Sequence, residues 1–112
     1  MNMTKLPLDV NDNPIPALKL KDDCAHVLDI NAATTRNVDP FSQETRVISI
    51  YSDVDVYVRF GENDVEATSS DHFFPAHVYY DLSIGGDGVG HSSYIAAIGV
   101  SGSGKLYISE KE

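Results

Sequence analysis

A chain of 112 residues and 12.2 kDa fits one domain of ordinary size. Hydrophobic residues make up 42% of the chain and charged residues 22%, a globular composition that excludes a disordered or collagen-like chain. Asp and Glu number 17 against 8 Lys and Arg, and the formal net charge of -9 disfavours binding to nucleic acid or to anionic membrane surfaces.

The first residues, Met1 to Val10, lack the apolar run of a secretory signal, and no stretch approaches the ~20 apolar residues of a membrane-spanning helix. We therefore expect a soluble protein without a membrane partner. Cys24 is the only cysteine, which excludes an intramolecular disulfide and a thiolate metal cluster within one chain. A nucleophilic Cys24 would need a histidine as its partner, and the spacing to His26 places the two residues only on the same face of a strand. We therefore interpret Cys24 as a small buried or half-buried thiol and not as a nucleophile.

The N-terminal segment 1–21 is rich in residues that favour turns and extended backbone. Pro7, Pro14 and Pro16 are interspersed with a cluster of Asp and Asn at 9–13. We predict an extended N-terminal arm over 1–21 and a folded domain over 22–112, with a disordered terminus as the alternative for the arm.

The body of the chain shows the period of β-strands. Its clearest segment is Val54 to Phe60, where Val54, Val56, Val58 and Phe60 occupy one face and polar or aromatic residues the other. Strands are also predicted near 24–30, 46–51, 78–84, 94–100 and 105–109. The segment 101–104 has the length and the glycines of a hairpin connection between the last two. Short strands at regular spacing predict an all-β fold, an antiparallel β-sandwich of jelly-roll-like type.

Two segments imitate ligand-binding motifs without completing them. Gly99 to Lys105 matches the start of a phosphate-binding loop, but Leu106 stands where a magnesium-binding hydroxyl belongs. Asp9 to Asn13 imitates the start of a calcium loop, but Pro14 replaces the required glycine. The histidines are scattered, and the carboxylates do not single out an acid and a base. We therefore predict no catalytic, cofactor-binding or metal-binding residues, and no enzymatic activity.

The six tyrosines are the other candidates for a role in recognition. Together these tyrosines, including Tyr51, Tyr57, Tyr79 and Tyr80, could form a platform that stacks on sugars or an interface patch, since a tyrosine presents an apolar ring and a polar tip. Packing in the core and across strands competes for the same side chains.

Several short segments follow one another in a characteristic order along the chain. They are Lys5 to Asp9 with Asn13 to Pro16, Arg46-Val47 with Val56 to Gly61, and Ala67-Thr68, Ser70 to Phe73 and Pro75-Ala76, followed by Ile95 to Ile98 and Gly104 to Glu110. In this order, which covers nearly the whole chain, the sequence resembles small proteins encoded by tailed bacteriophages and prophages. The glycine-rich loop at Gly85 to His91 departs from the pattern.

The resemblance implies a capsid decoration, or cement, protein. Such a protein is made in the host cytoplasm, sits on the outer surface of the virion and bridges subunits of the major capsid protein. We expect a non-enzymatic homo-oligomer, dimer or trimer, without cofactors. The alternatives are a virion carbohydrate-binding module for host adhesion and a head-to-tail or tail component. The candidate capsid-contacting residues of the arm are Leu6, Pro7, Leu8, Pro14, Ile15, Pro16 and Leu18.

Overall fold

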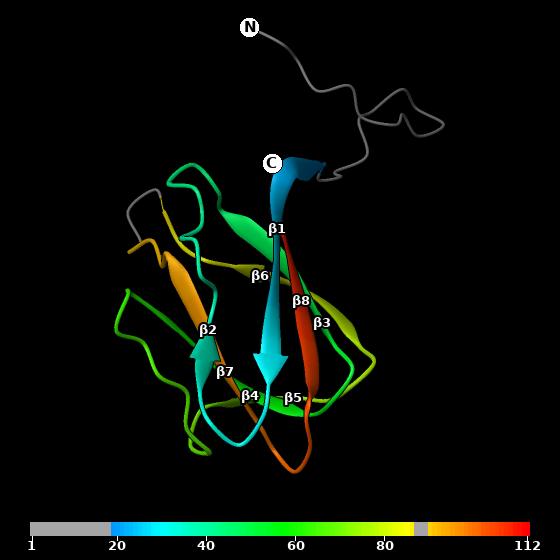
Figure 1. The fold of residues 1–112 in the computed structure, drawn as a ribbon. Helices are drawn as coiled ribbons and strands as arrows, with labels where there is room; N and C mark the ends of the chain where they lie inside the picture. The colour runs from blue at the N-terminus through cyan, green and yellow to red at the C-terminus, as the bar shows by residue number, and fades with distance from the viewer. Residues whose placement is uncertain (1–18, 87–89) are drawn as a thin grey trace, which may run out of the picture.

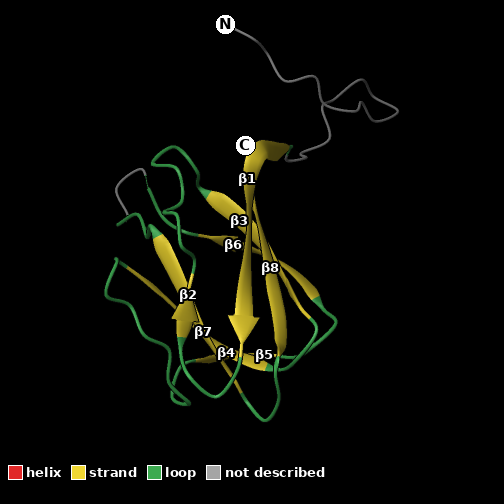
Figure 2. Cartoon of the chain, viewed as in Figure 1, coloured by secondary structure: helices red, strands yellow, loops and turns green. Residues whose placement is uncertain are grey.

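The computed structural model of the chain describes residues 19–86 and 90–112, and these form eight β-strands (Figure 1). The strands are β1 (Leu20–Ile30), β2 (Thr35–Arg36), β3 (Val47–Ser52), β4 (Val56–Gly61), β5 (His72–Phe74), β6 (Tyr79–Ser83), β7 (Tyr94–Gly99) and β8 (Gly104–Lys111). Strands and loops account for all of this part of the chain, and no helix is drawn in it (Figure 2). It accordingly contains no helix that is long and apolar enough to cross a membrane.

The strands build two antiparallel sheets of four strands each. One sheet has the order β1-β8-β3-β6 and the other the order β2-β7-β4-β5. Four of the pairings are nested along the chain: β1 pairs with β8, β2 with β7, β3 with β6 and β4 with β5. The chain therefore runs back alongside itself, and the all-β sandwich expected from the sequence is confirmed.

The core lies between the two sheets and consists of the inward-facing residues of both. The first sheet contributes mainly Leu28, Ile30, Ile48, Ile50, Leu106 and Ile108, and the second Val56, Val58, Ile95 and Ala97, all at most 2% exposed. Val56 and Val58 of β4 are fully buried, while Phe60 of β4 and Val54, which precedes the strand, pack against the core and are partly buried. The predicted face of this strand is therefore confirmed, although the strand begins at Val56.

The connection between β7 and β8 differs from the predicted hairpin. β7 belongs to the second sheet and β8 to the first, so residues 100–103 cross from one sheet to the other and do not join paired strands. The hairpin prediction was wrong because a short, glycine-rich connection suits both geometries. The glycines allow neighbouring atoms to come close to the backbone. A Cβ on Gly99 would lie 2.5 Å from the carbonyl oxygen of Gly102, and one on Gly104 would clash with Asp53. Of the described glycines, the two with positive φ are Gly85 and Gly86.

The beginning of β1 is tied to the end of β8. The backbone N–H of Lys19 donates to the carbonyl of Glu112 at 3.0 Å, and the N–H of Glu112 donates to the carbonyl of Lys19 at 2.8 Å. β1 begins at Leu20, so it extends two residues into the segment predicted as an arm. Its register with β8 is irregular between Leu20 and Ala25, where Asp23 has a φ of 60°.

Candidate interaction surface

A row of apolar and aromatic side chains crosses the outer face of the first sheet. Val27 of β1 lies opposite Tyr107 of β8, Tyr107 lies opposite Tyr51 of β3, and Tyr51 lies opposite Tyr79 of β6. Val27 and Tyr79 are each 55% exposed and Tyr107 is 45% exposed, while Tyr51 is partly buried. We call these four residues the tyrosine row. At the usual separation of neighbouring strands the row is about 14 Å long.

Ion pairs border the tyrosine row on both sides. Next to its β1 end, Nζ of Lys105 donates to Oδ1 of Asp29 at 2.5 Å. On the other side and at the opposite end, Nζ of Lys111 donates to Oδ1 of Asp81 at 2.7 Å. The hydrogen bond to Asp81 raises the pKa of Lys111, and the one to Asp29 raises that of Lys105. The four charges of these two pairs cancel, while Asp53, which accepts a hydrogen bond from the backbone N–H of Lys105 at 2.7 Å, adds a further carboxylate to this border.

Two further contacts fix the rings at the β6 end of the row. The Tyr51 hydroxyl and Nδ1 of His77 form a hydrogen bond of 3.0 Å, and His77 itself donates its backbone N–H to Ser52. The ammonium group of Lys111 lies 5.2 Å from the centre of the Tyr79 ring, in a cation–π contact. These contacts limit ring motion and reduce the entropy that binding would cost.

The other tyrosines named from the sequence lie elsewhere. Tyr57 is on the outer face of the second sheet, where its ring meets that of Phe73 edge to face at 5.9 Å. Tyr80 faces the core, and the centre of its ring lies 4.9 Å from the centre of the Phe74 ring. Of the six tyrosines considered as candidates, the structure thus brings together Tyr51, Tyr79 and Tyr107. The row was not predictable because neighbouring strands in it are far apart in the sequence.

A buried carboxylate closes one end of the core. Glu110 continues the inner face of β8 after Leu106 and Ile108 and is 2% exposed. Its carboxylate accepts hydrogen bonds from Thr45 Oγ1 at 2.6 Å, from the backbone N–H of Ser42 at 2.9 Å and from Nε2 of His26 at 2.9 Å. Burial acts to raise the pKa of Glu110, but these hydrogen bonds outweigh it, and the pKa is lowered. Period-2 alternation could have revealed Glu110 as a charged residue on an apolar face.

Cys24 lies on the same face of β1 as His26, as expected, and is partly buried. Burial raises the pKa of its thiol, and the nearby Glu110 carboxylate raises it further. Since the thiolate is the reactive form, this environment disfavours Cys24 as a nucleophile. Nε2 of His26 is hydrogen-bonded to Glu110 and not to the thiol of Cys24, so Cys24 and His26 do not form a catalytic pair.

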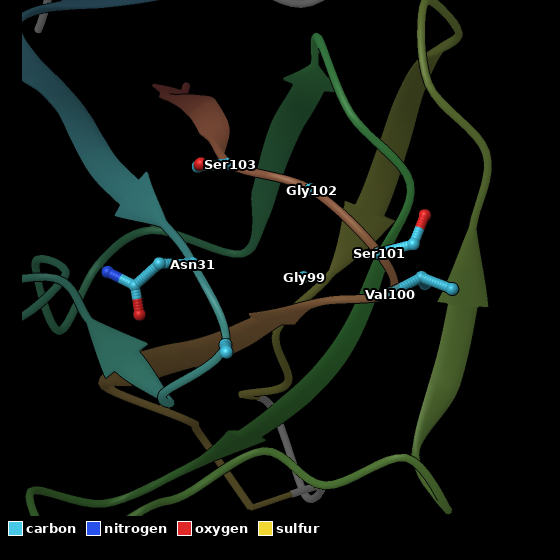
Figure 3. Close-up of a pocket in the computed structure, with 7 residues that line it drawn as sticks. Asn31, Gly99, Val100, Ser101, Gly102 and Ser103 are labelled. Atoms are coloured by element: carbon cyan, nitrogen blue, oxygen red, sulfur yellow. The ribbon is translucent and has the colours of Figure 1, made fainter.

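The segment that imitates a phosphate-binding loop lines a shallow pocket of about 360 Å³ (Figure 3). Asn31, Ala32 and residues 99–103 form its walls, and the labelled side chains do not converge on a common point (Figure 3). Lys105 does not point a free ammonium into it, because it pairs with Asp29. The pocket therefore lacks the cation that a phosphate would need.

The histidines do not come together. His26, His77 and His91 each hydrogen-bond a different partner, and His72 is exposed on β5. Within residues 19–86 and 90–112 no three His, Cys, Asp or Glu side chains are placed to hold a metal ion. The seven predicted arm residues lie outside the described residues; they are Leu6, Pro7, Leu8, Pro14, Ile15, Pro16 and Leu18.

Comparisons of the chain with protein-family models, with curated proteins and with solved structures found no match. The fold assignment comes from the strand order and register of this chain alone.

Proposed function

We propose that the protein is a non-enzymatic structural protein of a tailed-phage virion that decorates the outer surface of the capsid and bridges neighbouring major capsid subunits. The proposal combines the family resemblance of the sequence with two features of the fold. It implies synthesis in the host cytoplasm and attachment after the shell has assembled.

The first feature is the nested pairing of the strands. A chain in which β1 pairs with β8, β2 with β7, β3 with β6 and β4 with β5 has the connectivity that we interpret as a jelly roll. Jelly rolls recur in viral capsid and lectin domains. Because a fold hosts many functions, this feature supports a virion protein only together with the resemblance.

The observation that carries the proposal is the fixed origin of the N-terminal segment. Lys19 forms two backbone hydrogen bonds with Glu112 at the end of the first sheet, and its ammonium group lies 3.8 Å from the Glu112 carboxylate. Lys19, the residue that follows segment 1–18, is therefore held at a defined point at the end of the first sheet. An extended chain of that length reaches up to about 60 Å, enough for a second contact on a neighbouring subunit.

Two weak contacts joined in this way act together. The second contact becomes intramolecular once the first has formed, so the pair binds far more tightly than either alone. A ligand that binds only the assembled lattice also stabilises that lattice against disassembly. The acidic charge is compatible with an outward-facing position, because packaged DNA is not the partner.

The test uses virions of the phage that carries this gene, purified after the gene has been deleted. Full-length protein added back should co-sediment with the heads and raise the temperature at which they release DNA. Protein lacking residues 1–18, which leaves β1 intact, should bind substantially more weakly while unfolding at an unchanged denaturant concentration. Val38→Ala, at a position 86% exposed in a loop, serves as the control and should bind normally.

Absence of binding by the full-length protein would reject the decoration role, and full binding by the truncated protein would reject the role of the arm. Imaging that places the protein at the tail would favour the tail-component alternative. The other alternative, a carbohydrate-binding module, is favoured by a separate observation, the tyrosine row.

Self-association into a dimer or trimer is part of the proposal. The edges of the sheets are β1, β6, β2 and β5, and exposed edges invite pairing unless they are covered. Light scattering on the purified protein measures the state directly. A monomer at high micromolar concentration would contradict self-association in solution, and the capsid would then have to cover these edges.

A further inference from the structure

We propose that the tyrosine row is a binding site for an uncharged polysaccharide chain, which lies across the strands of the first sheet. The inference goes beyond the decoration role and does not depend on it. It rests on the shape of the row, the chemistry of its rings and the polar groups along its two sides.

The shape of the row favours a linear ligand. It is one residue wide and runs from β1 to β6, which are the two edges of the sheet. A protein-binding hot spot is usually central and surrounded by a rim that excludes water. This row reaches both edges and has no such rim at its ends, whereas a sugar chain can enter at one edge and leave at the other.

The rings supply the apolar contact. Tyr79 and Tyr107 are exposed by about half and stand two strands apart, with the partly buried Tyr51 between them. The spacing between strands, about 4.8 Å, is close to the length of one sugar unit in a chain. Successive sugar rings can therefore meet successive side chains of the row. The C–H groups of a sugar carry little charge and pack on the negative face of an aromatic ring.

The ion pairs supply the polar contacts. Asp29 with Lys105 and Asp81 with Lys111 lie on opposite sides of the row and at opposite ends. In each pair the carboxylate is more than half exposed, at 78% for Asp29 and 51% for Asp81, so it keeps free lone pairs for solvent or ligand. In such a pair the carboxylate can accept a hydrogen bond from one sugar hydroxyl and the ammonium can donate one to the neighbouring hydroxyl, while the ion pair itself stays intact.

Charge decides between neutral and acidic sugars. The protein carries a net charge of -9, and the four charges of the two ion pairs that border the row cancel. The net negative charge of the protein would repel an acidic polysaccharide, and no local excess of cations would offset this repulsion. A neutral polysaccharide is not repelled.

The test is titration of the full-length protein with neutral hexasaccharides of β-1,4-glucan, chitin, maltodextrin and β-1,3-glucan at up to millimolar concentration. A hexamer of galacturonic acid serves as the acidic comparison. Because the chain contains no Trp, its tyrosine fluorescence reports directly on the rings, and NMR of ¹³C-labelled tyrosines identifies which rings move. We expect saturable binding of at least one neutral hexasaccharide, with shifts at Tyr79 and Tyr107, and none of the acidic hexamer.

Variants separate the row from the rest of the surface. Tyr79→Ala and Tyr107→Ala should each weaken binding roughly three- to tenfold, and Tyr79→Phe with Tyr107→Phe should retain most of it because the rings remain. Phe73→Ala is the matched control, since Phe73 is 52% exposed on the other sheet. All these side chains lie on the surface, and denaturant unfolding checks that each variant keeps its fold.

Failure of all four neutral hexasaccharides to bind would overturn the proposal, as would binding that survives the double variant Tyr79→Ala/Tyr107→Ala or is lost in Phe73→Ala. If the double variant instead loses attachment to virions while no sugar binds, the row is a protein contact. Normal attachment of that variant to virions leaves the decoration role intact whatever the sugars do, so the two proposals fail separately.

Discussion

Replacement of Glu110 by Ala is expected to destabilise the sandwich far more than the same replacement of an exposed charged residue. Its buried carboxylate accepts three hydrogen bonds, from Thr45, Ser42 and His26, at 2.6 to 2.9 Å. Hydrogen bonds to a charged group contribute about 1.5–3 kcal/mol each. The sum overstates the loss, because the variant also relieves the cost of burying the charge. Removal of one partner from a buried charged pair typically costs about 3–5 kcal/mol, and we expect that range.

The change acts on more than one element. His26 packs its ring edge to face on Phe41 at 5.1 Å, and Thr45 and Ser42 belong to the loop that leads into β3. Without the carboxylate, the donors of Thr45, Ser42 and His26 lose their acceptor at buried or partly buried positions. Glu110→Gln should be milder, since its amide oxygen can still accept from the Thr45 hydroxyl and the Ser42 N–H.

Urea unfolding followed by circular dichroism measures the free energy of unfolding, and the linear extrapolation is applied to each variant in the same buffer. Glu112→Ala is the matched control. Glu112 is the same residue type two positions further along, but its ion pair with Lys19 is exposed and should contribute about 0–1 kcal/mol. If Glu110→Ala costs no more than Glu112→Ala, the hydrogen-bond network does not stabilise the fold and the reasoning is refuted.

Three further outcomes are expected. The folded state lowers the pKa of Glu110, so the stability that its ionised carboxylate contributes is complete above the unfolded-state pKa of ~4.3 and is lost as the pH falls through the folded-state pKa. If the free energy of unfolding of Glu110→Gln fell with pH as steeply as that of the wild type, this would be contradicted. Leu28→Ala should cost ~2–5 kcal/mol and Val27→Ala at most about 0.5 kcal/mol, because β1 buries the first side chain and exposes the second; comparable losses in urea unfolding would place both on one face. Gly104→Ala should cost ~1–3 kcal/mol, since its new Cβ would meet Asp53 and Val54, whereas Gly102→Ala has open space and should unfold like the wild type.

The fold class could be predicted from the sequence because alternation is a local property. The run from Val54 to Phe60 identified both the strand and its inward face, and the alternation at Leu28 and Ile30 did the same for β1. The two-residue strand β2 was missed, since two residues carry no period. Segment lengths do not show which strands pair, and this is why the sequence between β7 and β8 predicts a hairpin that the structure does not form.

The candidate site could be predicted only as a list of residue types. Tyr51 and Tyr79 are among the candidate tyrosines of the sequence, but so are Tyr57 and Tyr80, which the structure places on the other sheet and in the core. What separates them is register, and register in this sheet is set between strands up to about 80 residues apart, as with Val27 and Tyr107. A single sequence contains no signal for such pairing. Glu110 was different, because its position after Leu106 and Ile108 made its burial foreseeable.

The nested pairing of the strands has a consequence for how the protein is made. Only β4 and β5 are partners that also follow each other along the chain, while β1 must wait for β8, which comes last. During synthesis from the N-terminus, β1 therefore leaves the ribosome long before the strand that completes its sheet. Loop-closure entropy makes such distant pairings slow, as in other β-sandwiches that fold in milliseconds to seconds. Until β8 emerges, β1 has no neighbour in its sheet and β3 can pair only with β6, so the nascent chain carries unpaired strand edges through most of its synthesis.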